Sequence, residues 1–131
     1  MENGTSNKIF YNKLVRDKIQ DKIESKGEQC EVREITDDNE FQQELLKKIR
    51  EEATALSSVR TRTDFLDEYA DLMVVIDALT ATMGFSEADI QIAIEENVKE
   101  KGLYNKKHFL HWSADDDYVS NETPQGVKDD A

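Results

Sequence analysis

The stretch KIREEATALSSVRTRTDFLDEYADLM, residues 48–73, joins the end of one helical pattern to the start of another through a short polar link. The apolar residues that lead into the link recur every three or four positions, which predicts a helix with one buried face that ends near Ser57. Beyond the link the chain stays apolar as far as Gly84, which predicts a second and more central helix. Helices joined by a short link pack as antiparallel neighbours, so the stretch predicts an all-α fold. The apolar residues of the first pattern are Phe41, Leu45, Ile49, Ala53 and Leu56.

Capping residues indicate where these two helices begin. Thr36 or Asp37 is the candidate N-cap of the first, and Glu40 stands three positions after Asp37, as in a capping box. Thr63 is the candidate N-cap of the second.

Three further segments surround this pair. Residues 11–27 place apolar side chains near one face and are predicted to form a first helix that Gly27 ends. Residues 28–35 alternate apolar and charged side chains, which favours a short extended segment, because a lone strand would have no partner. Ser86 opens a last helix that Gly102 ends. The sequence therefore predicts four helices, with a short extended segment between the first and the second.

Composition limits the class of protein. The chain has 131 residues and a formal net charge of -12, which fits one acidic domain and argues against duplex nucleic acid or an anionic membrane surface as a partner. No stretch approaches the roughly 20 apolar residues of a membrane span, and one cysteine excludes an intrachain disulfide. The polar start lacks the apolar core of an export signal. We predict a cytoplasmic protein with a flexible arm at 1–10, a folded domain at 11–112 and an acidic disordered tail at 113–131.

Acidic residues in this stretch are spaced for a shared site. Glu68 and Asp71 are three positions apart, so their side chains point the same way, and Glu51 and Glu52 lie on the preceding helix. In an antiparallel pair, a carboxylate from the first helix faces Glu68 and Asp71 on the second. Converging oxygen ligands suit Mg²⁺ or Mn²⁺, which share their coordination shell with substrate phosphates. The alternative is a solvated acidic face, but apolar residues interleave with Glu68 and Asp71, and partly buried charge requires a partner.

These motifs resemble those of the all-α nucleoside triphosphate pyrophosphohydrolases, the MazG-like superfamily, which includes phosphoribosyl-ATP pyrophosphohydrolase and the dimeric dUTPases. The resemblance rests on Glu51-Glu52 followed by Glu68-x-x-Asp71, on NKLVRDKI near the start of the chain and on EKGLYNKK after the last helix. The four motifs occur in the family order and span residues 11–110. The resemblance implies a four-helix MazG-like bundle that assembles as a homodimer or homotetramer, with its sites at subunit interfaces.

The same motifs imply roles for individual residues. Glu52, Glu68 and Asp71 match the magnesium ligands, Mn²⁺ being a possible substitute, and Glu51 matches the adjoining carboxylate, so that these four form the implied catalytic group. For the two basic residues near the start, an ordinary surface salt bridge with Asp17 or Asp21 is the alternative, and for the three late lysines it is simple solvation. The positions that match phosphate contacts are Lys13, Arg16, Lys101, Lys106 and Lys107.

Two departures from the family pattern affect the site. The first motif is Glu-Glu-x-x-Glu in the family, whereas Ala55 stands at the last position here, which makes tight binding of two metal ions doubtful. The late motif reads Lys101-Gly102-Leu103-Tyr104 in place of Arg-Gly-Gly-Phe, so a point charge replaces a bidentate donor. Neither change removes a single-metal site built from Glu52, Glu68 and Asp71.

The predicted function is therefore that of a Mg²⁺-dependent pyrophosphohydrolase. It would cleave a nucleoside triphosphate, standard or non-standard, into the monophosphate and pyrophosphate. One alternative is a phosphoribosyl-ATP pyrophosphohydrolase. Another is a nucleotide-binding or protein-interacting module that has lost turnover, with Ala55 as its mark.

Overall fold

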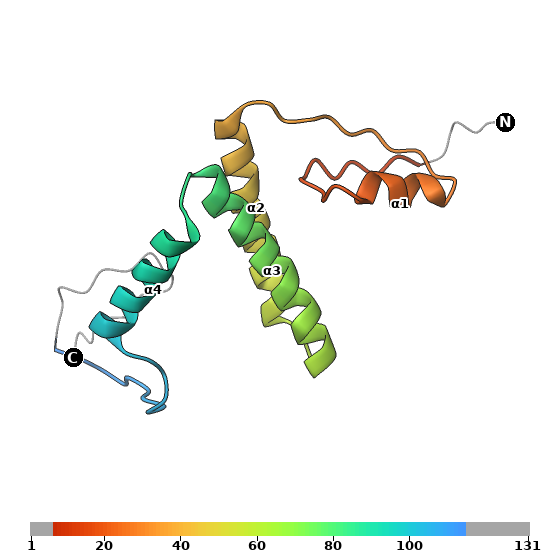
Figure 1. The fold of residues 1–131 in the computed structure, drawn as a ribbon. Helices are drawn as coiled ribbons and strands as arrows, with labels where there is room; N and C mark the ends of the chain where they lie inside the picture. Colours follow the sequence, from red (N-terminus) through yellow and green to blue (C-terminus); the bar gives the residue numbers. More distant parts are fainter. Residues whose placement is uncertain (1–6, 115–131) are drawn as a thin grey trace. The chain divides into compact units, whose positions relative to one another are not determined.

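The computed structural model describes residues 7–114, and this part of the chain is helical, with no strand (Figure 1). The predicted all-α class is confirmed. Residues 1–6 of the predicted arm and 115–131 of the predicted tail lie outside the described residues. The chain divides into two compact units, Met1–Ala93 and Ile94–Ala131. The helices are α1 (Ile19–Ser25), α2 (Asp38–Ser57), α3 (Arg62–Thr82) and α4 (Glu87–Lys101).

Side-chain caps set the starts of α2 and α3. The Asp37 carboxylate accepts a hydrogen bond from the backbone N–H of Glu40 at 3.2 Å, which confirms the predicted cap of α2. The cap of α3 is Thr61, whose hydroxyl accepts from the backbone N–H of Asp64 at 3.1 Å. The prediction of Thr63 was wrong by two positions, because Thr61 already has an extended backbone and a residue three positions later to bind.

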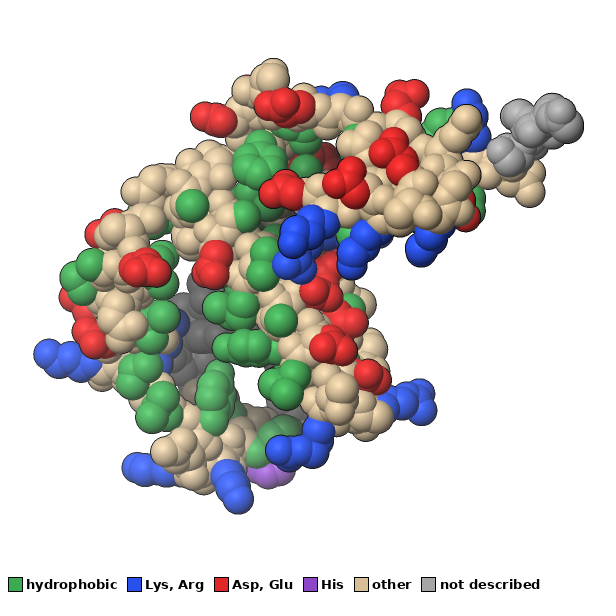
Figure 2. All heavy atoms as spheres, turned by 45° about the vertical axis from the view of Figure 1, so that its right-hand side comes forward, with side chains coloured by type: hydrophobic (Ala, Val, Ile, Leu, Met, Phe, Trp, Pro, Cys, Tyr) green, Lys and Arg blue, Asp and Glu red, His purple; other side chains and the backbone are tan. Residues whose placement is uncertain are grey.

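The helices α2 and α3 pack against each other, as their short link predicted, and they are the only pair of helices in contact within residues 7–114 (Figure 1). Leu45 and Val75 form the buried core, with 4% and 7% of their surface exposed. Many large hydrophobic side chains stay at the surface of the single chain (Figure 2). The complete four-helix bundle and the oligomer therefore remain predictions.

Helix α1 is shorter than predicted. It begins at Ile19, whereas the apolar pattern indicated a helix over residues 11–27. The segment before it is held in another conformation, because Asn12 has a left-handed backbone with φ of 48° and because Lys13 and Arg16 form ion pairs with distant residues. The predicted stop is confirmed, since Gly27 follows the helix with φ of 81°.

The predicted extended segment is a connection without helix or strand, residues 28–37. Arg33 in this connection forms an ion pair with Glu40 in the first turn of α2. The guanidinium of Arg33 also donates hydrogen bonds to the Glu40 carboxylate, and these bonds lower the pKa of Glu40 and raise the pKa of Arg33. The connection is thereby fastened to the start of α2.

Ser86 precedes α4, as predicted, and forms a reciprocal cap with Asp89. The backbone N–H of Ser86 donates to the Asp89 carboxylate at 2.9 Å, and the backbone N–H of Asp89 donates to the Ser86 hydroxyl at 3.1 Å. These hydrogen bonds lower the pKa of Asp89.

Among the described residues, none of the helices is by itself both long and apolar enough to cross a membrane.

Candidate metal centre

Three carboxylates meet where α2 and α3 pack together. Glu52 comes from α2, and Glu68 and Asp71 come from successive turns of α3. One oxygen of each lies within 4.8 Å of the others, and all three residues are half-buried. The antiparallel packing thus brings together the three residues that the sequence motifs singled out as a ligand set.

The Glu52 side chain is more enclosed than that of Asp71. It is 14% exposed, against 43% for the side chain of Asp71. Burial raises the pKa of Glu52, and the charges of Asp71, Glu51 and Glu68 act in the same direction, whereas Lys48 acts against them. A carboxylate in this position is costly to ionise without a cation, so the environment favours a bound positive charge.

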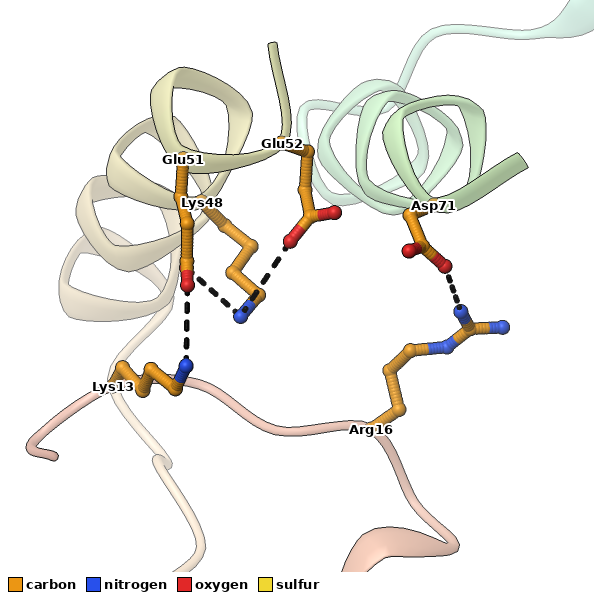
Figure 3. A network of polar contacts seen from close by, with 6 residues as sticks. All are labelled: Lys13, Arg16, Lys48, Glu51, Glu52 and Asp71. Atoms are coloured by element: carbon orange, nitrogen blue, oxygen red, sulfur yellow. Dashed lines mark hydrogen bonds and ion pairs between the residues drawn. The ribbon is translucent and has the colours of Figure 1, made fainter. Parts of the chain in front are cut away.

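Glu51 lies on the same turn of α2 but has different partners. Its carboxylate accepts a hydrogen bond from Lys48 at 2.9 Å and one from Lys13 at 3.1 Å (Figure 3). These lysines lower the pKa of Glu51, the hydrogen bond from Lys48 having the largest effect, although partial burial opposes them. Glu51 is therefore held ionised and turned toward cations of the protein, and it is not one of the three converging ligands.

The segment before α1 runs past the open side of the carboxylates. Lys13 reaches Glu51 on α2, and Arg16 reaches Asp71 on α3, where its guanidinium donates to the carboxylate at 3.2 Å (Figure 3). Among the described contacts, these long-range pairs replace the local salt bridge with Asp17 that was weighed as the alternative. Two of the five predicted phosphate-binding residues thus lie beside the carboxylates.

The other three predicted phosphate contacts are Lys101, Lys106 and Lys107, which belong to the second unit. All three residues are exposed, Lys101 at the end of α4 and the other two in the segment that follows. Their part in the site remains a prediction.

The place of Lys48 beside the carboxylates was not predicted from the sequence. This residue precedes Glu51 and Glu52 by three and four positions, a spacing that usually marks a weak surface ion pair. In the structure its side chain is only 16% exposed, and its ammonium lies 3.9 Å from a Glu52 oxygen. The signal available in the sequence was its position on the same helical face as Glu52 and the buried Leu45.

The donor set fits a hard divalent cation. Three carboxylates from two packed helices supply oxygen ligands only, and oxygen ligands are the kind that Mg²⁺ prefers. Ala55 is half-buried one turn beyond Glu51 and offers no ligand. The residues present therefore suit one ion better than two.

Comparisons of the chain with known protein families, with curated proteins and with solved structures found no match.

Proposed function

We propose that the protein is a Mg²⁺-dependent nucleoside triphosphate pyrophosphohydrolase similar to the MazG-like superfamily. The observation that carries this proposal is the convergence of Glu52, Glu68 and Asp71 within 4.8 Å, with Lys13 and Arg16 beside them. Carboxylates next to cationic side chains are the combination that binding of a metal–polyphosphate complex requires, because the acids hold the metal and the bases hold the phosphate oxygens.

In the proposed reaction, water attacks a phosphorus of the triphosphate and the bond between the α and β phosphates breaks. Nucleoside monophosphate and pyrophosphate leave. A bound Mg²⁺ would neutralise phosphate oxygens and lower the pKa of a coordinated water. Glu52, Glu68 and Asp71 would hold this ion, while Lys13 and Arg16 would exchange their carboxylate partners for phosphate oxygens.

The two adjacent glutamates have different tasks in this scheme. Glu52 is a ligand, and its raised pKa is lowered again when a divalent cation takes up its charge. Glu51 is the carboxylate outside the ligand set and is the remaining acceptor for the proton of the attacking water. Because Lys48 and Lys13 lower its pKa, Glu51 is a weak base, and it accepts a proton more readily once Lys13 turns to the substrate.

We propose a homodimer or homotetramer as the working form, in the cytoplasm. The support comes from the apolar side chains that the single chain leaves exposed on α2 and α3, among them Leu46, Leu66 and Val74. A protein surface with such residues in number is typical of an interface between subunits. The completed four-helix bundle belongs to this proposal.

Release of pyrophosphate from a panel of nucleoside triphosphates, with and without Mg²⁺, tests the proposed function. The panel includes dUTP, dCTP, oxidised nucleotides and phosphoribosyl-ATP, which separates the general enzyme from the phosphoribosyl-ATP-specific one. We expect Mg²⁺-dependent release that falls at least about a hundredfold in Glu68→Gln, because one of three ligands is lost. Turnover that persists in EDTA or in this variant would refute the proposal.

A nucleotide-binding module without turnover is the second candidate. The observation in its favour is Ala55, a half-buried methyl group at the position of the missing acid. Nucleotide binding that requires Mg²⁺ and yields no pyrophosphate would select this candidate.

A further inference from the structure

Two neighbouring lysines on α2 have different environments. The side chain of Lys47 is 74% exposed and pairs with Glu44 at 2.8 Å. The side chain of Lys48 is 16% exposed and points into the gap beside Glu51 and Glu52 (Figure 3). A lysine can bury its aliphatic stem against a helix while carboxylates or water surround its ammonium. Lys48 therefore belongs to the carboxylate site, whereas Lys47 belongs to the surface.

The ammonium of Lys48 lies between carboxylates of different function. It donates a hydrogen bond to Glu51 Oε2 at 2.9 Å, and it is 3.9 Å from Glu52 Oε1, which is an electrostatic contact without a hydrogen bond. An ammonium has three N–H donors, so it can serve Glu51 and a further oxygen at once. Lys48 thus fixes the direction of Glu51 and adds positive charge next to a candidate metal ligand.

The Lys48 ammonium leaves room for one divalent ion beside it. Glu51, Glu52, Glu68 and Asp71 carry a formal charge of -4. One divalent ion together with the Lys48 ammonium leaves one negative charge, whereas two ions with the ammonium leave one positive charge, so the position of the ammonium, and not the sum of the charges, opposes a second ion. A second ion that used Glu51 and Glu52 as ligands would also lie next to the ammonium and be repelled by it.

We propose that Lys48 takes the place of a second divalent ion, so that each chain binds one ion and the ammonium contacts a phosphate oxygen of the bound nucleotide. This inference rests on the proposed function and adds to it a stoichiometry and a residue. Lys48 would keep Glu51 in position and would neutralise part of the polyphosphate charge. The absence of an acid at position 55 agrees with this arrangement, because a second ion would lack that ligand.

Titration of the full chain with Mn²⁺, followed by calorimetry and by the electron paramagnetic resonance signal of free Mn²⁺, tests the inference without any turnover. We expect one ion per chain in the wild type and in Lys48→Arg. In Lys48→Met, which keeps the length of the side chain and loses its charge, we expect a second ion that binds more weakly than the first, because the repulsion is removed while position 55 still offers no ligand. The matched control is Lys47→Met, which should bind one ion, because Lys47 lies outside the site.

A second readout is binding of a non-hydrolysable triphosphate analogue in the presence of Mn²⁺. Loss of a charge-assisted hydrogen bond in Lys48→Met should weaken binding of the analogue about tenfold, with Lys47→Met unchanged. A lysine that only supports the packing of α2 would lower the melting temperature and change neither the number of ions nor the affinity for the analogue.

The outcomes separate the inference from the function on which it rests. A wild-type protein that binds no Mn²⁺ contradicts the proposed function, and the role of Lys48 falls with it. A wild-type protein that binds two ions, or a Lys48→Met variant that still binds one, overturns the role of Lys48 alone. Should Lys48→Met fail to fold by circular dichroism, Lys48→Gln is titrated against the same expectation.

Discussion

Neutralising Glu52 distinguishes a shared cation site from an ordinary acidic surface. The variant Glu52→Gln removes the charge and keeps the shape. A ligand oxygen of Glu52 lies within 4.8 Å of those of Glu68 and Asp71. At that distance two unit charges repel each other by about 1 kcal/mol in water and by about 3 kcal/mol at the effective dielectric constant near a protein surface.

Two such repulsions act on Glu52, and the Lys48 ammonium at 3.9 Å offsets roughly one of them. Burial of the carboxylate adds to the repulsion that remains. Because the Asp71 side chain is 43% exposed, solvent screens the remaining repulsion, and we expect Glu52→Gln to increase the free energy of unfolding of the metal-free protein by at least about 1 kcal/mol at neutral pH. For a chain of this size, that raises the melting temperature by roughly 4 °C.

Magnesium should reverse the order of the two proteins. At about ten times its dissociation constant, Mg²⁺ stabilises the wild type by about 1.4 kcal/mol, whereas Glu52→Gln has lost a ligand and gains little. Thermal unfolding followed by circular dichroism, in EDTA and in Mg²⁺, measures both effects. The variant is expected to be the more stable protein in EDTA and the less stable one in saturating Mg²⁺.

Glu44→Gln is the matched control. The Glu44 side chain lies on the same helix, is 20% exposed and pairs with Lys47 at 2.8 Å. Its neutralisation should cost less than about 0.5 kcal/mol and leave the effect of Mg²⁺ intact. A Glu52→Gln protein that is destabilised in EDTA and is still stabilised by Mg²⁺ would refute the reasoning.

Three further predictions concern the same site. Burial raises the pKa of Glu52 above its usual 4.5, so the stability of the wild type falls as the pH rises from 4.5 through the pKa of the folded state. Unfolding curves in EDTA at stepped pH should therefore show that the stability gained in Glu52→Gln vanishes below pH 4.5, and a gain that does not vary with pH contradicts this. Ala55→Glu should raise the affinity for Mn²⁺ about tenfold and lower metal-free stability, as titration and thermal unfolding report; an unchanged affinity would show that position 55 does not face the ion. Arg16→Gln should change the free energy of unfolding by less than about 0.5 kcal/mol, because the ion pair of Arg16 with Asp71 is exposed. Because Arg16 and the metal ion compete for Asp71, calorimetric titrations of this variant should show stronger metal binding and weaker nucleotide binding, and weaker metal binding would contradict the competition.

The α2–α3 pair was predictable from the sequence because local signals agree there. The apolar period, the Asp37 cap and the short polar link all indicate two antiparallel helices, and the acids at helical spacing then meet. The geometry of Glu52, Glu68 and Asp71 follows from that packing. The sequence therefore predicted that these three carboxylates meet, because residues at helical spacing on the facing sides of two packed helices lie close together.

The parts that differed from prediction depend on contacts between distant residues. The segment before α1 has a helical apolar pattern, but Lys13 and Arg16 are held by acids that lie far along the chain, and no local pattern reports such pairs. Lys48 was missed for the opposite reason, because its spacing to Glu51 and Glu52 looks like a common surface pair. Only the packing of α2 against α3 reveals that this lysine is enclosed.

The location of a bound ion is the most direct test of the account. Crystals of the full chain grown with Mn²⁺ and measured near the manganese absorption edge would give an anomalous peak for each ordered ion. The account predicts one peak per chain, about 2 Å from oxygens of Glu52, Glu68 and Asp71, with Lys48 beside it. Carboxylates turned to solvent with no anomalous peak between them would contradict it.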